Sequence, residues 1–410
     1  MSIFSVFHKY RLKKNFSKIV ENDSFCILPW THAHLFPTGK VFPCCVAAIK
    51  PVGDLKESRF EDIWNSKLFR HLRKGMLNGK RSQLCKVCHH IEKTGTESPR
   101  QSFNKTFSKH LPRLLETKSD GSYAVATLPY IDIRFSNVCN FKCRTCDPNH
   151  SSLWNADMPG QTAPKVFKVS GLKNYPAALV KDSLEVAEEI YFAGGEPLLT
   201  KEHYEILTAL IEKKRDPRLR YSTNLSVTEF GGYKIKELWS HFSHVVVNVS
   251  IDDMNERGEF VRHGLDWNQF RNNFFELKEA LPQAAFNLAI TVSVLNVETL
   301  TTTLEKLLRE EWAPATGIYL SILQTPPYFS TQVMPLEMKL RIAADFADFA
   351  KRMRNEFGNK NDFVLSLLES VRSFMMAANR QDLLPELQKQ MRHLDAKRGE
   401  NTQQYLPWIF

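Results

Sequence analysis

The eight cysteines are the residues best able to do chemistry, and all of them lie within the first 146 of 410 residues. They form two groups. The first is Cys26, Cys44, Cys45, Cys85 and Cys88, and the second is Cys139, Cys143 and Cys146. Cysteines that staple a secreted fold are spread through it, whereas thiols gathered in a reducing compartment are typical of metal ligands. We therefore expect two metal sites and a cytoplasmic location.

The second group has the spacing C-x3-C-x2-C and follows a strand predicted at 130–135, where apolar residues alternate. Such a loop holds three thiolates close together. Iron–sulfur clusters are held by cysteine thiolates, and a four-iron cluster with three ligands keeps one iron open. A structural zinc ion would need a fourth ligand, which His150 could supply. The spacing alone leaves both metals open.

A second motif follows the next predicted strand, where the chain reads Gly194-Gly195-Glu196-Pro197. Two glycines let the backbone approach a bound molecule closely. The Glu196 carboxylate could accept a hydrogen bond from an ammonium group. Taken alone, this motif is a tight strand-to-helix turn, but downstream of C-x3-C-x2-C it indicates a binding site.

Together the two motifs resemble the radical S-adenosylmethionine (SAM) superfamily over residues 128–325. In that family, three cysteines bind a [4Fe-4S] cluster whose open iron is chelated by the amino and carboxylate groups of SAM. The resemblance implies that the cluster ligands here are Cys139, Cys143 and Cys146. It implies that the residues binding SAM include Gly194, Gly195, Glu196, Asn224 and Ser250. One position departs from the family pattern, because Thr145 stands where an aromatic residue often precedes the third cysteine.

The elements that must position these residues alternate between strand and helix, as in parallel α/β proteins. The predicted strands are 130–135, 189–193, 219–222, 245–251, 286–294 and 317–323, with helices predicted at 267–280 and 298–310. Six strands with helices between them match the partial (β/α)6 TIM-like barrel of the radical SAM family. Function collects at the carboxyl ends of such strands, where Asn224, Ser250, Asp252 and Arg262 follow. The alternative is that these residues cap helices and fold turns.

The N-terminal cysteines lie in a predicted hairpin at 33–42, an amphipathic helix at 60–76 and a C-x2-C pair. Three interpretations compete. Cys85-Lys-Val-Cys88-His89 has the haem-attachment pattern, which requires export. Four cysteines could hold a structural zinc ion. Four thiolates could instead hold a second iron–sulfur cluster.

The third interpretation fits a further resemblance, to the twitch module, the shorter relative of the SPASM extension of radical SAM enzymes. That module binds one auxiliary [4Fe-4S] cluster, and the ligands implied here are Cys26, Cys44, Cys85 and Cys88. Cys45 is left over, either as a small buried residue or as an alternative to Cys44. The module usually follows the barrel, whereas in this chain it precedes it.

The fold class expected is therefore α/β: a partial (β/α)6 TIM-like radical SAM barrel, a small N-terminal twitch-like module and a C-terminal helical extension. The expected parts are 1–100 for the module, 101–127 for a linker, 128–330 for the barrel and 331–410 for the extension, with helices at 335–357, 362–378 and 380–392. The composition, 43% hydrophobic and 24% charged, is that of a globular chain. The chain has no run of about 18 apolar residues, so the sequence predicts no membrane-spanning helix. The net charge of +10 is dispersed, which makes nucleic acid an unexpected partner.

The resemblance implies an enzyme that reductively cleaves SAM to a 5′-deoxyadenosyl radical and abstracts hydrogen from a small-molecule or peptide substrate. An electron donor such as flavodoxin or ferredoxin would serve it. A second cluster with four protein ligands has no open iron, so electron transfer, for instance during dehydrogenation, is its expected task. Peptide epimerisation and crosslinking stay open as reactions, and a zinc-binding scaffold that contacts nucleic acid is the competing class. The sequence names no catalytic residue, substrate or oligomeric state.

Overall fold

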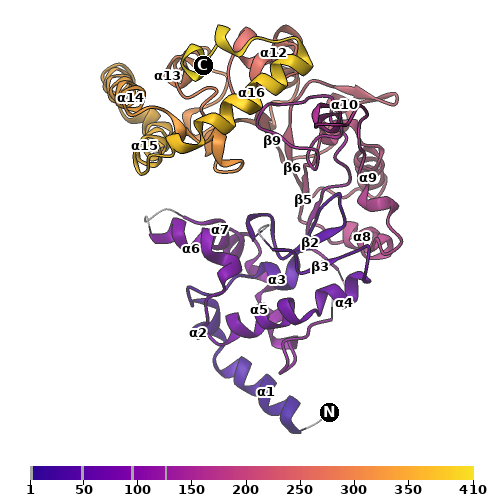
Figure 1. The fold of residues 1–410 in the computed structure, drawn as a ribbon. Helices are drawn as coiled ribbons and strands as arrows, with labels where there is room; N and C mark the ends of the chain where they lie inside the picture. Colours follow the sequence, from indigo (N-terminus) through magenta and orange to yellow (C-terminus); the bar gives the residue numbers. More distant parts are fainter. Residues whose placement is uncertain (1–2, 48–49, 94–96, 125–126) are drawn as a thin grey trace. The chain divides into compact units, whose positions relative to one another are not determined.

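The computed structural model describes residues 3–47, 50–93, 97–124 and 127–410, which Figure 1 colours from the N- to the C-terminus. The chain divides into two compact units. Unit 1 comprises residues 1–137, 167–194 and 205–219, and unit 2 comprises residues 138–166, 195–204 and 220–410. No helix of the described residues combines the length and the apolarity that crossing a membrane requires.

Unit 1 contains a portion of sheet with the strand order β5–β4–β1–β2–β3. These strands are β1 (His34–Leu35), β2 (Lys40–Phe42), β3 (Gly53–Asp54), β4 (Tyr130–Ile133) and β5 (Glu189–Phe192). The predicted hairpin is present as β1 and β2, with His34 opposite Phe42. β1 also pairs in parallel with β4, where His34 lies beside Asp132. The N-terminal hairpin therefore continues the sheet that β4 and β5 form.

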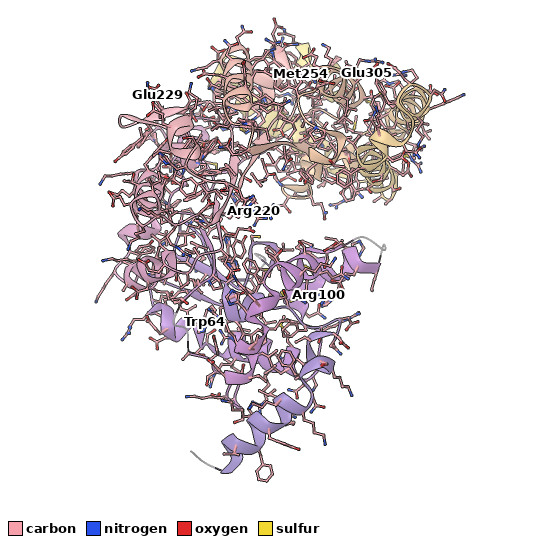
Figure 2. The ribbon with its side chains drawn as sticks, turned by 180° about the vertical axis from the view of Figure 1, so that it is seen from behind. Trp64, Arg100, Arg220, Glu229, Met254 and Glu305 are labelled. Carbon is pink, nitrogen blue, oxygen red and sulfur yellow. The ribbon has the colours of Figure 1, made fainter. Side chains whose placement is uncertain are left out.

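The helices of unit 1 supply four of its buried aromatic side chains, Trp30, Phe60, Trp64 and Phe69. These helices are α1 (Ile3–Lys14), α2 (Phe16–Val20), α3 (Leu28–Thr31), α4 (Phe60–Trp64), α5 (Lys67–Leu77), α6 (Lys86–Lys93), α7 (Pro99–Thr106) and α8 (Ala177–Leu184). The single helix predicted at 60–76 was wrong, because α4 ends at Trp64 and α5 begins anew. Ser66 caps α5 by accepting a hydrogen bond from the Phe69 backbone N–H at 3.4 Å. The break lets Trp64, labelled in Figure 2, stack on the buried Arg73 guanidinium at 4.5 Å.

The segment 101–127, expected to be a linker, carries regular structure. α7 extends into it, and a 3₁₀ helix follows over Ser108–Glu116. Phe103 and Phe107 stack on the ring of Tyr130 at 5.3 and 5.5 Å between centroids. Tyr130 belongs to β4, so this segment is packed against the first strand of the predicted barrel.

Unit 2 contains a second portion of sheet, in the order β11–β10–β9–β6. Its strands are β6 (Arg218–Thr223), β9 (Val245–Ser250), β10 (Ala284–Val292) and β11 (Ile318–Ile322). β10 pairs in parallel with both β9 and β11. Alternate residues of β10, from Phe286 to Val292, are buried, as expected for a strand with one face in the core. With β4 and β5, these are the six strands predicted from the sequence. A short hairpin of β7 (Glu229–Phe230) and β8 (Tyr233–Lys234) is additional.

Helices follow the strands of unit 2 in the predicted alternation. They are α10 (Ile235–Trp239), α11 (Asn255–Val261), α12 (Trp267–Ala280) and α13 (Leu300–Arg309), whereas α9 (Lys201–Glu212) follows β5 and has residues 205–212 in unit 1. The C-terminal extension forms the predicted helices, the orange to yellow α14 (Leu336–Phe357), α15 (Asp362–Met376) and α16 (Leu384–Arg398) of Figure 1. Each of the three buries an apolar side, with Phe349, Leu368 and Met391 fully or almost fully inaccessible to solvent. The α/β fold class with parallel pairing is confirmed.

Candidate cofactor sites

Cys139, Cys143 and Cys146 lie in a loop of unit 2 that backbone hydrogen bonds hold in a defined shape. The Cys146 N–H donates to the Cys143 carbonyl at 3.0 Å, which folds the C-x2-C end into a tight turn. The backbone N–H groups of Lys142 and Arg144 donate to the carbonyls of His263 and Val261, both at 2.8 Å. The C-terminal end of α11 therefore holds the backbone of residues 139–146 in place. We call these residues the cysteine loop.

The three thiols of the cysteine loop are half-buried and close enough to act on one another. Burial raises the pKa of Cys139 to about 12, and the neighbouring Cys143 adds to the rise. Burial, followed by the charges of Cys143 and Cys139, raises the pKa of Cys146 well above its usual value. Three adjacent thiolates are therefore unfavourable without a cation among them. A cationic metal core is the group whose chemistry fits this donor set.

Among the described residues, no three His, Cys, Asp or Glu side chains are grouped as ligands of one metal ion. His150, the fourth ligand considered for zinc, lies about half-exposed with its Nδ1 3.0 Å from Asp147 Oδ2. In the structure, His150 is thus engaged with Asp147.

In the G-G-E-P turn, position 194 requires a glycine, and the Glu196 carboxylate is hydrogen-bonded within the protein. Gly194 has φ +135°, and a Cβ there would lie 2.7 Å from the carbonyl oxygen of Ser136. Glu196 is 1% exposed. Its Oε1 accepts hydrogen bonds from the Leu198 N–H at 3.0 Å and the Thr223 hydroxyl at 2.7 Å, and its Oε2 accepts from the Asn224 N–H at 2.7 Å. The carboxylate expected to meet an ammonium group therefore already joins the turn to the end of β6.

Asn224 connects this turn to the cysteine loop. Its side-chain Nδ2 donates to Asn140 Oδ1 at 3.0 Å and lies 3.9 Å from Cys139 Sγ. Its Oδ1 accepts from the Ser226 hydroxyl and N–H. The Glu196 N–H donates to the carbonyl of Val138, the residue before Cys139, at 2.7 Å. The structure thus brings Glu196 and Asn224 to the first cysteine of the loop, with half-buried Gly195 preceding Glu196 in the turn.

Ser250 and its neighbours occupy the end of β9. Ser250 is half-buried and pairs with Ala289 of β10. Two residues further on, Asp252 accepts from Arg262 Nη1 at 2.9 Å and from the Thr291 N–H at 2.8 Å. The Arg262 charge lowers the pKa of Cys143 and Cys139, although their burial dominates. Arg262 and Asp252 therefore belong electrostatically to the cysteine loop, whereas Ser250 pairs with β10.

Four of the five N-terminal cysteines line one pocket of unit 1. The pocket is bounded by Cys26, Cys44, Cys85 and Cys88 together with apolar residues that include Leu28, Leu84 and Phe103. Cys45 does not line it, although its charge acts on Cys44 as well as on Arg134. Of this adjacent pair, which the sequence left as alternatives, only Cys44 lines the pocket.

The N-terminal pocket is electrostatically suited to thiolate ligands. Burial raises the pKa of Cys85 to about 11, and Cys88 contributes further. Arg100, labelled in Figure 2, is 6% exposed and lowers the pKa of both Cys26 and Cys85 against the effect of burial. The Arg100 guanidinium is held in place by hydrogen bonds that it donates to the Glu92 carboxylate at 2.8 and 3.0 Å.

Sequence reasoning missed Arg100, although a local signal was present. Ser98 and Gln101 form a reciprocal capping box at the start of α7, and the S-x-x-Q spacing is its sequence signature. That signature would have placed a helix, and with it Arg100, directly after the last N-terminal cysteine.

The C-terminal extension also reaches the cysteine loop, which no sequence pattern indicated. Arg144 of the loop is fully buried and pairs through Nη2 with Asp395 Oδ1 at 3.0 Å and with Glu400. Its Nε donates to the Phe260 carbonyl at 3.1 Å, and its guanidinium lies 3.9 Å from the Phe260 ring centroid. His263 Nδ1 lies 2.6 Å from Glu400 Oε1. These contacts, which we call the C-terminal clamp, fasten α16 and the turn after it to the cysteine loop.

Comparisons with known families assign both cysteine regions. Residues 133–307 match the radical SAM superfamily, and residues 26–89 match SPASM, an iron–sulfur cluster-binding domain. The first match contains Cys139, Cys143 and Cys146, and the second begins at Cys26. A SPASM match over Cys85 to His89 gives no support to the haem-attachment interpretation.

Curated relatives and solved structures resemble the chain over part of its length. GTP 3′,8-cyclase of Klebsiella pneumoniae is 27% identical over 132 residues, 31% of this chain and 35% of that protein. The enzyme of the same name from Campylobacter lari is 25% identical over 130 residues, 32% of this chain and 36% of that protein. The chain thus spans about a third of the length of these relatives.

Among solved structures, anSMEcpe with bound AdoMet has a TM-score of 0.40 at 18% identity, covering 57% of this chain and 60% of that one. Streptococcus suis SuiB bound to the precursor peptide SuiA has a TM-score of 0.35 at 10% identity, covering 70% and 63%. Likenesses this distant carry no argument about function.

Proposed function

Since residues 133–307 match the radical SAM superfamily and residues 26–89 match the SPASM iron–sulfur domain, we propose that this protein is an enzyme that reductively cleaves SAM and abstracts hydrogen from a substrate. The two domains imply a SAM-binding [4Fe-4S] cluster, SAM itself and an auxiliary iron–sulfur cluster. The proposed ligands of the first cluster are Cys139, Cys143 and Cys146. The proposed SAM-binding residues are Gly194, Gly195, Glu196, Asn224 and Ser250.

One observation carries the proposal. The Asn224 side chain lies 3.9 Å from Cys139 Sγ while its backbone N–H donates to Glu196. Two motifs far apart in the sequence, C-x3-C-x2-C and G-G-E-P, thereby meet at the carboxyl end of β6. In α/β barrels this end of the strands is where ligands bind and reactions occur. A structural role for the two motifs would not require them to converge there.

The chain's own residues would bind, orient and shield the cofactor. When bound, the reduced cluster supplies the electron that cleaves SAM to methionine and a 5′-deoxyadenosyl radical. Glu196 fixes the end of β6 through Thr223 and Asn224, which keeps the Asn224 amide at the cysteine loop. Gly194 leaves the turn without a side chain, so its backbone is free to approach a ligand. The half-buried position of the thiols limits the access of water to the reacting centre.

The N-terminal pocket supports an auxiliary [4Fe-4S] cluster bound by Cys26, Cys44, Cys85 and Cys88. With four protein ligands, such a cluster has no open iron for substrate, so we assign it to electron transfer. Accepting the electron that the substrate radical gives up as it also loses a proton would make the overall reaction a dehydrogenation. Peptide epimerisation and crosslinking are the alternatives. The substrate is a small molecule or a peptide, with flavodoxin or ferredoxin as electron donor in the cytoplasm.

The test separates the two sites. Anaerobically purified protein should be brown, with iron and sulfide for two clusters per chain, and should form 5′-deoxyadenosine with SAM and dithionite. Cys143→Ala should abolish this product while keeping the N-terminal iron. Cys88→Ala should lose the N-terminal iron instead. Cys45→Ala, at the one N-terminal cysteine outside the pocket, is the matched control and should keep both.

A colourless protein that holds zinc would contradict the proposal and favour the scaffold. Iron-replete protein that releases no 5′-deoxyadenosine above the Cys143→Ala background would also contradict it.

A further inference from the structure

Arg398, the last residue of α16, carries a buried guanidinium with unused hydrogen-bond donors. Its side chain is 0% exposed, and its Nε donates to Asp157 Oδ2 at 2.8 Å. Nη1 and Nη2 are buried and have no hydrogen-bond partner. Leaving charged N–H groups buried and unpaired is costly. A side chain kept in this state therefore points to a negatively charged group that binds beside it.

The position of Arg398 identifies where that group binds. Its guanidinium lies 5.6 Å from the ring centroid of Trp154. The Trp154 indole N–H in turn donates to the Cys143 carbonyl at 2.7 Å. Arg398 is also close enough for its charge to act on the Cys143 thiol. The unused donors thus lie in the surroundings of the middle cysteine of the C-x3-C-x2-C motif.

Asp157 only partly compensates the charge of Arg398, because a second cation shares that carboxylate. Lys142 Nζ lies 2.8 Å from Asp157 Oδ1 while Arg398 holds Oδ2. The Arg398 charge also acts on Glu400, but Glu400 pairs directly with Arg144. In the group formed by Lys142, Asp157 and Arg398, two cations therefore face one carboxylate.

We propose that Arg398 supplies positive charge and hydrogen-bond donors to the iron–sulfur cluster bound at Cys139, Cys143 and Cys146, and thereby raises its reduction potential. This inference rests on the proposed function. An iron core held by thiolates is net negative and gains one more negative charge when an external reductant delivers an electron. Net charge, hydrogen bonds to the sulfurs and solvent exposure set such potentials. A buried guanidinium stabilises the reduced form more than the oxidised one, because low dielectric strengthens the interaction.

The experiment is an anaerobic redox titration of the full chain, followed by electron paramagnetic resonance. Addition of SAM identifies which cluster signal belongs to the cysteine loop, and the auxiliary cluster serves as an internal reference. Arg398→Gln should lower the ratio of reduced to oxidised cysteine-loop cluster about tenfold at the wild-type midpoint, a shift of about 59 mV for one electron. The auxiliary cluster should not shift. Lys397→Gln, which removes the same charge from an exposed neighbour on α16, should shift neither cluster.

An unchanged midpoint in folded Arg398→Gln protein would overturn the inference, as would an equal shift of the auxiliary cluster. If that variant fails to take up iron, Asp157→Asn decides the matter by the opposite sign. Removing the carboxylate that neutralises Arg398 should raise the reduced fraction, and an unchanged or lower fraction contradicts the proposal. A wild-type protein without any SAM-responsive cluster would instead refute the proposed function, and this inference with it.

Discussion

Replacing Arg144 by methionine should release the C-terminal clamp from the cysteine loop. The substitution keeps an unbranched apolar stem against Phe260 but leaves Asp395 and Glu400 without their buried cation. Removing one partner of a buried ion pair costs about 3–5 kcal/mol. Because the two carboxylates are 16% and 20% exposed and keep part of their hydration, the lower end applies, about 3 kcal/mol.

Hydrogen exchange measures this change where it occurs. A cost of about 3 kcal/mol corresponds to a roughly hundredfold larger population of locally open states. Amides of α16 and of the turn after it should therefore exchange roughly a hundredfold faster in Arg144→Met protein. Those of α5, in unit 1, should exchange as before. Lys389→Met, at an exposed cation on α16, is the matched control and should change neither region.

The reasoning fails if α16 exchanges at the wild-type rate in Arg144→Met protein. In that case the ion pairs would contribute nothing net, and apolar packing alone would hold the extension. Equally fast exchange in the Lys389→Met control would show that α16 responds to any loss of charge.

The remaining predictions concern both sites. Gly194→Ala should weaken SAM binding at least about tenfold in equilibrium dialysis, because a Cβ would meet a backbone oxygen at 2.7 Å and φ is +135°; unchanged affinity would show that the turn can shift. Glu196→Gln should lower the free energy of unfolding by about 2 kcal/mol in urea, because an amide NH₂ must then face at least one of three donors; an unchanged value would mean that the carboxylate is protonated and already acts as a donor. Cys44→Ser should lose the auxiliary iron and Cys45→Ser should keep it, measured by iron content after anaerobic purification; the reverse result would exchange the two assignments. Burial raises the pKa of Glu400, but the hydrogen bond to His263 and the charge of Arg144 together lower it by more. The net pKa therefore lies below the usual 4.5. The stabilisation by Glu400 is then present above pH 4.5 and disappears as the pH falls through the lowered pKa, so α16 amides should lose protection only in that acidic range.

The elements that were predicted correctly are those with a clear local signal in the sequence, such as apolar periodicity between well-marked ends. The helix at 267–280 was predicted residue for residue, because apolar periodicity runs between clear ends and Asp266 caps the start by accepting from the Gln269 N–H at 2.9 Å. The same periodicity joined 60–76 into one helix, although Ser66 begins a new one. The helix cap at Ser66 was a usable signal, but the continuous apolar periodicity of residues 60–76 concealed it.

The candidate site likewise contains residues that the sequence could predict and residues that it could not. Cys139 and Glu196 belong to motifs that sequence alone can bring together, because their chemistry is tied to fixed spacings. Arg144 and Glu400 lie 256 positions apart, and a pairing of opposite charges over such a separation leaves no periodic trace. Contacts made by the C-terminal extension therefore needed the structure, whereas the cysteine ligands did not.

The parallel pairing of β1 with β4 has a consequence for dissecting this protein. A truncation that starts after the N-terminal hairpin would strip β4 of a neighbour and leave backbone donors and acceptors bare along it. Tyr130 would also lose the two phenylalanine rings that cover it if the cut fell after Phe107. Residues 128–410 expressed by themselves should therefore aggregate. The hairpin and the two phenylalanine rings complete the packing of β4.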